Sequence, residues 1–280
     1  MRFLIIGGDG TLGSAMQAGL EAAGHVVDAT SRRPGSPMHL DLSDDLTDWC
    51  APQGYAVALL FAAVSSLDTC ERSPEETRRV NVDNTILAAK KLLDAGTGVI
   101  FPSTSLVFNG EQPFPHETDD LSPITEYGRQ KAEAEVLLRA LEGNVQVIRY
   151  SKIVTLPMPL LCGWRRSLEA GEVVTPFQDM VFSPIPLDYA VESTMAIALN
   201  GGPGIWHVSG DAALSYAAAA LLIAEDMGAD TSLIVPKTIR ESGIAAMVRG
   251  NAALDTSRLR KELGLVPPSV ESTILNAVRV

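Results

Sequence analysis

The stretch Phe3-Leu4-Ile5-Ile6-Gly7-Gly8-Asp9-Gly10-Thr11-Leu12-Gly13 decides the fold of this 280-residue chain. Apolar residues of strand length run directly into a glycine-rich turn, and apolar residues at helical spacing follow over 12–23. Such a turn lets the backbone approach a pyrophosphate, because no Cβ stands in the way and the helix N-terminus attracts negative charge. The stretch therefore predicts a dinucleotide-binding unit. The residues of the turn that we expect to bind the cofactor are Gly7, Gly10, Thr11, Leu12 and Gly13.

The same alternation of strand-length and helical segments continues through the first 150 residues. It predicts an α/β fold, a doubly wound, Rossmann-like parallel sheet with a small C-terminal substrate lobe. We expect a dinucleotide-binding domain over 1–152 and mainly a substrate-binding lobe over 153–280, with elements of about 185–210 returning to the first domain. The predicted strands are 3–6, 25–30, 56–62, 99–101, 147–150 and 205–208, and the predicted helices are 12–23, 75–93, 126–141, 161–169, 215–227 and 255–263.

Charge and hydropathy exclude several classes of partner. The chain has 22 Lys and Arg against 34 Asp and Glu, a net charge of -12 that repels the phosphates of nucleic acid. No apolar stretch approaches the roughly 18 residues of a membrane span, and the N-terminal apolar run is too short for a signal peptide. Cys50, Cys70 and Cys162 are isolated and no histidine lies at ligand spacing, so we expect no metal site. These features predict a soluble cytoplasmic protein without a nucleic-acid or membrane partner.

The end of the second predicted strand reads Ser31-Arg32-Arg33, about 20 residues after the glycines, where the adenosine ribose binds in such folds. A carboxylate there would favour NAD. A hydroxyl and guanidinium groups suit a 2′-phosphate instead, since arginine offers planar charged donors to phosphate oxygens. We therefore expect Ser31 and Arg32 to bind the cofactor, with NADP(H) preferred and NAD(H) as the alternative. Solvated surface arginines are the other interpretation.

Thr104, Tyr127 and Lys131 form the candidate catalytic group. Tyr127 and Lys131 are four residues apart and share one face of the predicted helix 126–141. An ammonium and a cationic nicotinamide ring favour a phenolate, so we expect the tyrosine pKa to fall below its usual value of about 10. Thr104 ends a central strand and can hold a substrate carbonyl beside Tyr127, which exchanges the proton during hydride transfer while Lys131 bonds the nicotinamide ribose. The alternative is a surface helix pair and a strand-end hydroxyl.

These residues resemble the extended short-chain dehydrogenase/reductase superfamily, and within its NAD-dependent epimerase/dehydratase group the dTDP-4-dehydrorhamnose reductase-like proteins. The similarity runs over nearly the whole chain and is most specific in Ser103-Thr104-Ser105-Leu106-Val107-Phe108-Asn109-Gly110 and Tyr127-Gly128-Arg129-Gln130-Lys131. The resemblance implies Thr104, Tyr127 and Lys131 as catalytic triad, NADPH as hydride donor and a nucleotide-linked 4-keto sugar as substrate. It also implies further cofactor contacts from Asp41 and Leu42 on the adenine side and from Ala62 and Ala63 along the dinucleotide.

Substrate contacts are less determined. Ser105 and Leu106 replace the Asp-Tyr pair of the family beside the substrate, which implies another sugar or other contacts. Trp164 and Arg165, with Arg166, lie on a short predicted helix where the arginines meet a substrate diphosphate or form a solvated face above the tryptophan. A reductase or epimerase is the leading interpretation, a regulatory cofactor-binding subunit with little activity is the second, and a structural NADP-binding subunit is the third. The oligomeric state is open, and a homodimer is one option.

Overall fold

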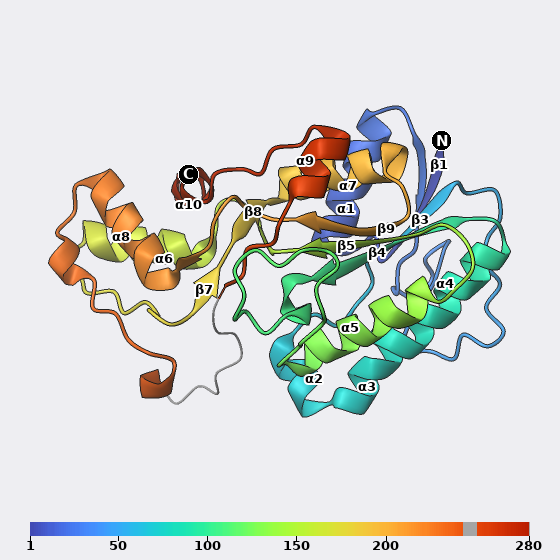
Figure 1. Cartoon of the computed structure of the whole chain (residues 1–280), viewed down its shortest axis with the longest axis horizontal. Coiled ribbons are helices and arrows are strands. Elements are labelled where there is room, and N and C mark those ends of the chain that lie inside the picture. The colour runs from blue at the N-terminus through green and yellow to red at the C-terminus, as the bar shows by residue number, and fades with distance from the viewer. Residues whose placement is uncertain (243–250, 280) are drawn as a thin grey trace.

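The computed structural model describes residues 1–242 and 251–279. A six-stranded sheet with the order β2-β1-β3-β4-β5-β9 forms its centre (Figure 1). Every neighbouring pair of these strands is parallel, which confirms the predicted fold class. The strands are β1 Arg2–Ile6, β2 Val26–Ala29, β3 Val57–Leu60, β4 Gly98–Thr104, β5 Val145–Tyr150 and β9 Gly204–Val208.

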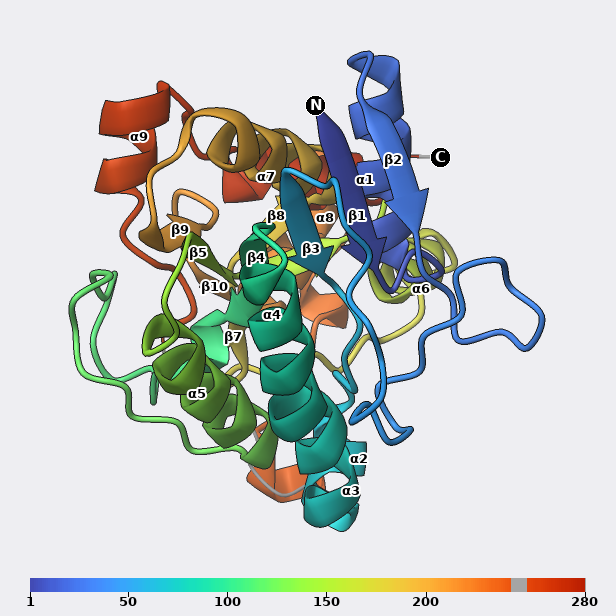
Figure 2. The ribbon, with the colours of Figure 1, turned by 90° about the vertical axis from the view of Figure 1, so that its right-hand side faces the viewer.

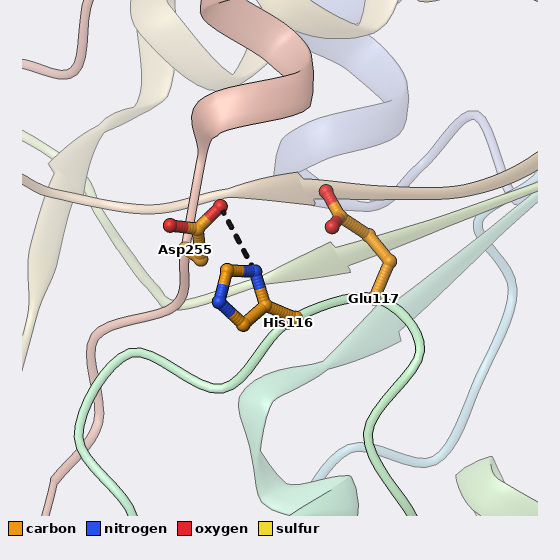
Figure 3. Close-up of side chains that lie close together, drawn as sticks. All are labelled: His116, Glu117 and Asp255. Atoms are coloured by element: carbon orange, nitrogen blue, oxygen red, sulfur yellow. Dashed lines mark ion pairs between the residues drawn. The ribbon is translucent and has the colours of Figure 1, made fainter.

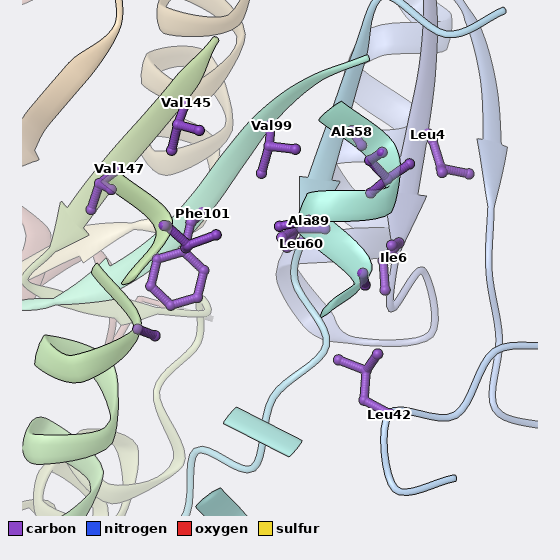
Figure 4. Close-up of a cluster of buried hydrophobic side chains, with 14 of the residues drawn as sticks. Leu4, Ile6, Leu42, Ala58, Leu60, Ala89, Val99, Phe101, Val145 and Val147 are labelled. Carbon is purple, nitrogen blue, oxygen red and sulfur yellow. The ribbon is translucent and has the colours of Figure 1, made fainter. Parts of the chain in front are cut away.

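Helices cover both faces of the sheet (Figures 1 and 2). Alternating side chains of the strands supply the two cores, because successive residues of a strand point to opposite faces. In β1, Phe3 and Ile5 belong to one buried cluster. Leu4 and Ile6 belong to the other, which Figure 4 shows. On the first face lie α1 Thr11–Ala22, α7 Leu187–Asn200 and α9 Ser257–Leu263, and on the second lie α2 Leu67–Arg72, α3 Pro74–Arg78, α4 Thr85–Asp94 and α5 Glu126–Arg139.

A second, smaller group of elements has its own apolar core and lies at the far left of Figure 1. Its parts are α6 Pro159–Glu169, α8 Tyr216–Met227 and α10 Val270–Asn276, the antiparallel pair β7 Val181–Phe182 and β10 Leu214–Ser215, and the parallel pair β6 Lys152–Val154 and β8 Pro184–Pro186. The chain leaves this group through α7 and β9, which join the main sheet, and α9 returns there as well. The predicted lobe range 153–280 includes residues 243–250 and 280, which lie outside the described residues.

Two boundaries in the main sheet differ from the prediction. The strand expected over 99–101 continues to Thr104, although Pro102 lacks an N–H. The strand tolerates this proline because β3 pairs with β4 only as far as Ile100, so one side of β4 is free beyond that point. The helix expected over 75–93 is continuous, but a π-helical turn over Arg79–Asn84 joins α3 to α4. Such turns are frequent at functional sites. Apolar spacing does not predict α2, α7 or α10.

The described helices include none with the length and apolar character needed to cross a membrane.

Candidate active site

The glycine turn forms an anion cradle at the carboxyl end of β1. Helix α1 begins after Gly10, and among the described residues no side chain caps it and no acidic residue occupies its first turn. The amides of the first turn therefore have no intrahelical acceptor and are open to an anion, which the helix dipole favours. A Cβ on Gly13 would lie 2.3 Å from the carbonyl oxygen of Gly7, so only glycine permits this turn. The cradle fits a pyrophosphate.

The end of β2 lies beside this turn. The Ser31 hydroxyl donates a hydrogen bond to the carboxylate of Asp9 and accepts one of 3.0 Å from the Arg33 amide. Nε of Arg33 also lies 3.7 Å from Asp9, and both Arg32 and Arg33 are exposed. Asp28 lies within β2, before the end of the strand. Sequence reasoning did not connect Asp9 with the ribose end of the site, because the two segments are far apart in the chain.

The expected adenine-side residues are held by local and long-range hydrogen bonds. The Asp41 carboxylate accepts from the amide and the hydroxyl of Ser43, both at 2.8 Å. These bonds hold the pKa of Asp41 below its ordinary value. The carbonyl of Leu42 accepts a 2.8 Å bond from the side-chain amide of Asn84, which lies in the π-helical turn. The long loop after β2 is thereby anchored to the helix layer.

The turn after β3 lies next to the glycine turn. The Ala62 amide donates a 2.9 Å hydrogen bond to the Ile6 carbonyl, which extends the sheet contact to the start of the cradle. Ala63 precedes Val64, whose amide and carbonyl are both bound by the side chain of Asn81, at 2.8 and 2.9 Å. The π-helical turn therefore positions this segment as well as the loop after β2.

Thr104 and Tyr127 are brought together by a close contact between β4 and α5. The Thr104 hydroxyl accepts a 3.2 Å bond from the Leu106 amide, so its proton is free for another acceptor. Gly128 packs against the same turn, where a Cβ would lie 2.3 Å from the Leu106 carbonyl oxygen. Lys131 lies one turn further along α5, with its ammonium 5.9 Å from the centre of the Tyr127 ring. Thr104 thus ends the strand β4, and Tyr127 and Lys131 lie on the helix that packs against this strand end.

The expected lowering of the Tyr127 pKa depends on a cationic nicotinamide ring as well as on Lys131, and the protein's own residues act in the opposite direction. Burial raises the pKa of Tyr127, because a phenolate would lose its hydration. The Lys131 ammonium does not offset this effect, since it donates a 2.9 Å bond to the Pro102 carbonyl and lies 4.3 Å from the centre of the Phe101 ring. Burial also lowers the pKa of Lys131 to about 8. The phenol is therefore held protonated, which is the form that donates a proton.

A buried polar network lies directly below the candidate triad and was not anticipated from the sequence. The Glu135 carboxylate accepts from the Ser103 hydroxyl and from Arg149, whose Nη2 is 2.7 Å away. Arg149 Nη1 is 3.3 Å from Nε2 of His207. The His207 Nδ1 is 3.1 Å from the Asp255 carbonyl, which can only accept, so Nδ1 carries the proton and Nε2 accepts from Arg149. Burial and the neighbouring guanidinium lower the pKa of His207 to about 3.

His116, Glu117 and Asp255 meet between the loop after β4 and the start of α9 (Figure 3). His116 Nδ1 lies 3.5 Å from Asp255 Oδ1, which ties the loop to α9. Glu117 has one carboxylate oxygen buried without a hydrogen-bond partner among the described residues, and burial raises its pKa. His116 is exposed at the rim of this group. The spacing of these residues in the chain does not predict their meeting, since 138 residues separate Glu117 from Asp255.

A family model described as the RmlD substrate binding domain matches residues 1–279. The chain belongs to this family. It is similar to the probable low-salt glycan biosynthesis reductase Agl14 of Haloferax volcanii, with 28% identity over 98% of this chain and 96% of the relative. It is also similar to methionine adenosyltransferase 2 subunit beta of Danio rerio, with 27% identity over 78% of this chain and 69% of the relative. The match confirms the resemblance drawn from the motifs.

The fold of this RmlD-family chain is also that of solved enzymes. A dTDP-4-dehydrorhamnose reductase from Bacillus anthracis, crystallised in complex with NADP, aligns with a TM-score of 0.82 at 20% identity. The alignment covers 98% of this chain and 96% of the reductase. At this identity the likeness concerns the fold.

The expected substrate residues of this RmlD-family chain fall into two groups. Ser105 and Leu106 form the short helical turn directly after Thr104 and lie beside the triad. Trp164 and Arg165 lie on α6 in the smaller group of elements, and their described contacts are structural. Trp164 packs edge-on against the Tyr216 ring, and Arg165 bonds Glu169 of its own helix and the carbonyl of Val278.

Proposed function

We propose that this chain is an NAD(P)H-dependent reductase of a nucleotide-linked 4-keto sugar. The observation that carries the proposal is the close packing of the turn after Thr104 against the first turn of α5, which carries Tyr127, at the same edge of the sheet as the anion cradle. Membership of the RmlD family and the likeness to a glycan biosynthesis reductase support the sugar substrate. The epimerase alternative also needs hydride transfer and the same triad.

Different residues of the chain have different roles in the proposed reaction. A bound nicotinamide cofactor would supply a hydride to the carbonyl carbon. The Thr104 hydroxyl accepts a hydrogen bond from the Leu106 amide, so its own O–H can donate a hydrogen bond to the carbonyl oxygen of the substrate and orient the carbonyl group. Tyr127 then transfers its proton to that oxygen, which gives an alcohol. The Tyr127 phenol is protonated at neutral pH, so it can act as the acid in this step.

Lys131 has a positioning role in this scheme. Its ammonium is anchored by the Pro102 carbonyl, and burial brings its pKa to about 8, so a small change in surroundings alters its charge. A ribose hydroxyl would add a hydrogen-bond acceptor beside the ammonium and stabilise the charged form.

The test is NADPH and NADH oxidation by the purified protein with a panel of nucleotide-linked 4-keto sugars, for wild type and Tyr127→Phe. We expect turnover by wild type and a loss of about 10²-fold or more in Tyr127→Phe, with cofactor affinity retained. Tyr189→Phe is the matched control, because Tyr189 lies on α7 at the opposite face of the sheet. Full turnover by Tyr127→Phe would reject Tyr127 as the proton donor.

A regulatory cofactor-binding subunit is the second candidate. The likeness to methionine adenosyltransferase 2 subunit beta favours it, as do Ser105 and Leu106 in place of the usual substrate contacts. Cofactor binding without turnover of any sugar in the panel, together with a stoichiometric enzyme partner recovered from native extract, would support this candidate over the reductase.

A further inference from the structure

Asp9, in the middle of the glycine turn, lies against the end of β2. The turn is tied there by a 3.0 Å hydrogen bond from the Gly8 amide to the Thr30 carbonyl. The Asp9 carboxylate accepts a hydrogen bond from the Ser31 hydroxyl, and its other oxygen is 3.7 Å from Nε of Arg33. One carboxylate therefore engages both the hydroxyl and one of the guanidinium groups on which a preference for NADP(H) depends.

Charge at this end of the site is balanced. Asp9 pairs with Arg33. Hydrogen bonds from Ser43 are the main cause of the lowered pKa of Asp41, and the nearby charge of Arg32 adds to it. The two cations that suggest a 2′-phosphate site thus each lie near a carboxylate. A phosphate dianion that approached Ser31 would meet the like charge of Asp9, and repulsion between charges a few ångströms apart is substantial even near solvent.

Two other carboxylates near this end of the sheet are already committed, and one of them, Asp41, accepts hydrogen bonds from the amide and the hydroxyl of Ser43. Asp28 accepts a 2.8 Å bond from Nη2 of Arg2 and a 2.9 Å bond from the Tyr55 hydroxyl. Its position in β2 also precedes the strand end. Asp9 is therefore the carboxylate placed to accept a hydrogen bond from a ribose hydroxyl, the role that an acidic residue at the end of the second strand has in NAD-binding folds.

We propose that Asp9 is a specificity-determining residue of the cofactor site. It lowers the selectivity of the site for a 2′-phosphate and accepts a hydrogen bond from the 2′-hydroxyl of an unphosphorylated adenosine ribose. The assignment rests on the proposed function, because it requires that a nicotinamide dinucleotide binds at the glycine turn.

The experiment measures dissociation constants of NADPH and NADH for wild type, Asp9→Asn and Asp9→Ser by isothermal titration calorimetry. We expect both variants to shift the ratio of the NADH constant to the NADPH constant by on the order of tenfold toward NADPH, because the opposing charge is gone while Ser31 and Arg33 remain. Asp28→Asn is the matched control, a carboxylate-to-amide change at a residue bonded to Arg2 and Tyr55, and it should leave the ratio unchanged.

The outcomes separate this inference from the proposed function. An unchanged ratio in both Asp9 variants, with cofactor still bound, overturns the role of Asp9 alone. Tight binding of both cofactors by wild type without turnover of any keto sugar contradicts the reductase and leaves the Asp9 test intact, since that test measures binding only. Wild type that binds neither cofactor overturns both. Circular dichroism checks that each variant is folded. If one of the two Asp9 variants does not fold, the other still tests the proposal.

Discussion

Replacing Glu135 by Gln should destabilise the protein more than any exposed charge change. Glu135 on α5 accepts hydrogen bonds of 2.7, 3.0 and 3.1 Å from Arg149 on β5, and the two side chains are only 1% and 2% exposed. Breaking such a buried pair by removing one partner costs about 3–5 kcal/mol, since it leaves an uncompensated charge. The neutral amide of Gln cannot balance the guanidinium, which would face amide hydrogens as well as one oxygen.

Equilibrium urea unfolding at pH 7, followed by tryptophan fluorescence, measures this loss. With a slope of roughly 3 kcal/mol/M, a loss of about 3–5 kcal/mol lowers the midpoint by about 1–1.7 M. Glu169→Gln is the control, because Glu169 forms an exposed pair with Arg165 on α6 and its loss should stay within about 0.5 kcal/mol.

A double-mutant cycle tests the reason for the effect. Glu135→Leu combined with Arg149→Met removes both charges, so the double variant should be more stable than the sum of the single losses predicts by about 2 kcal/mol or more. The reasoning is refuted if Glu135→Gln loses less than about 1 kcal/mol or if the two single losses simply add.

Three further results are expected. Gly13→Ala should weaken NADPH binding at least tenfold by titration, because its Cβ would lie 2.3 Å from the Gly7 carbonyl and distort the cradle; an unchanged affinity would contradict the cradle. The pKa of Lys131 is about 8 in the folded chain and about 10.4 in the unfolded chain. Between these pH values the unfolded chain binds more protons than the folded one. The stability of wild type relative to Lys131→Met should therefore rise with pH across this window. The pKa of His207 is about 3 in the folded chain, against 6.5 in the unfolded chain. As the pH falls, the unfolded chain therefore binds this proton first. The stability of wild type relative to His207→Gln should fall as the pH drops from 6.5 towards 3. Urea unfolding at several pH values checks both, and a pH-independent difference would rule out the assigned pKa shift.

Most of the fold follows from local patterns. The alternation of strands and helices predicts the parallel sheet, and the glycine turn after β1 predicts the cradle, because both depend on neighbouring residues. The four-residue spacing of Tyr127 and Lys131 likewise places them on one helix face. Boundaries were less accurate where tertiary contacts decide them, as in β4, which passes Pro102 because β3 has already ended.

The sequence by itself therefore determined the sheet, the cradle and the placing of Tyr127 and Lys131 on one helix face, since each is set by spacing within strands, a turn or a helix. The packing of α5 against the end of β4, which brings Tyr127 towards Thr104, belongs to the tertiary structure. Only the tertiary structure decided that the pKa of Tyr127 is raised, because a pKa depends on burial, and burial depends on which distant segments cover the side chain. The contact of Asp9 with Ser31 has the same origin, since parallel strands bring their carboxyl ends to one edge of the sheet whatever the length of chain between them.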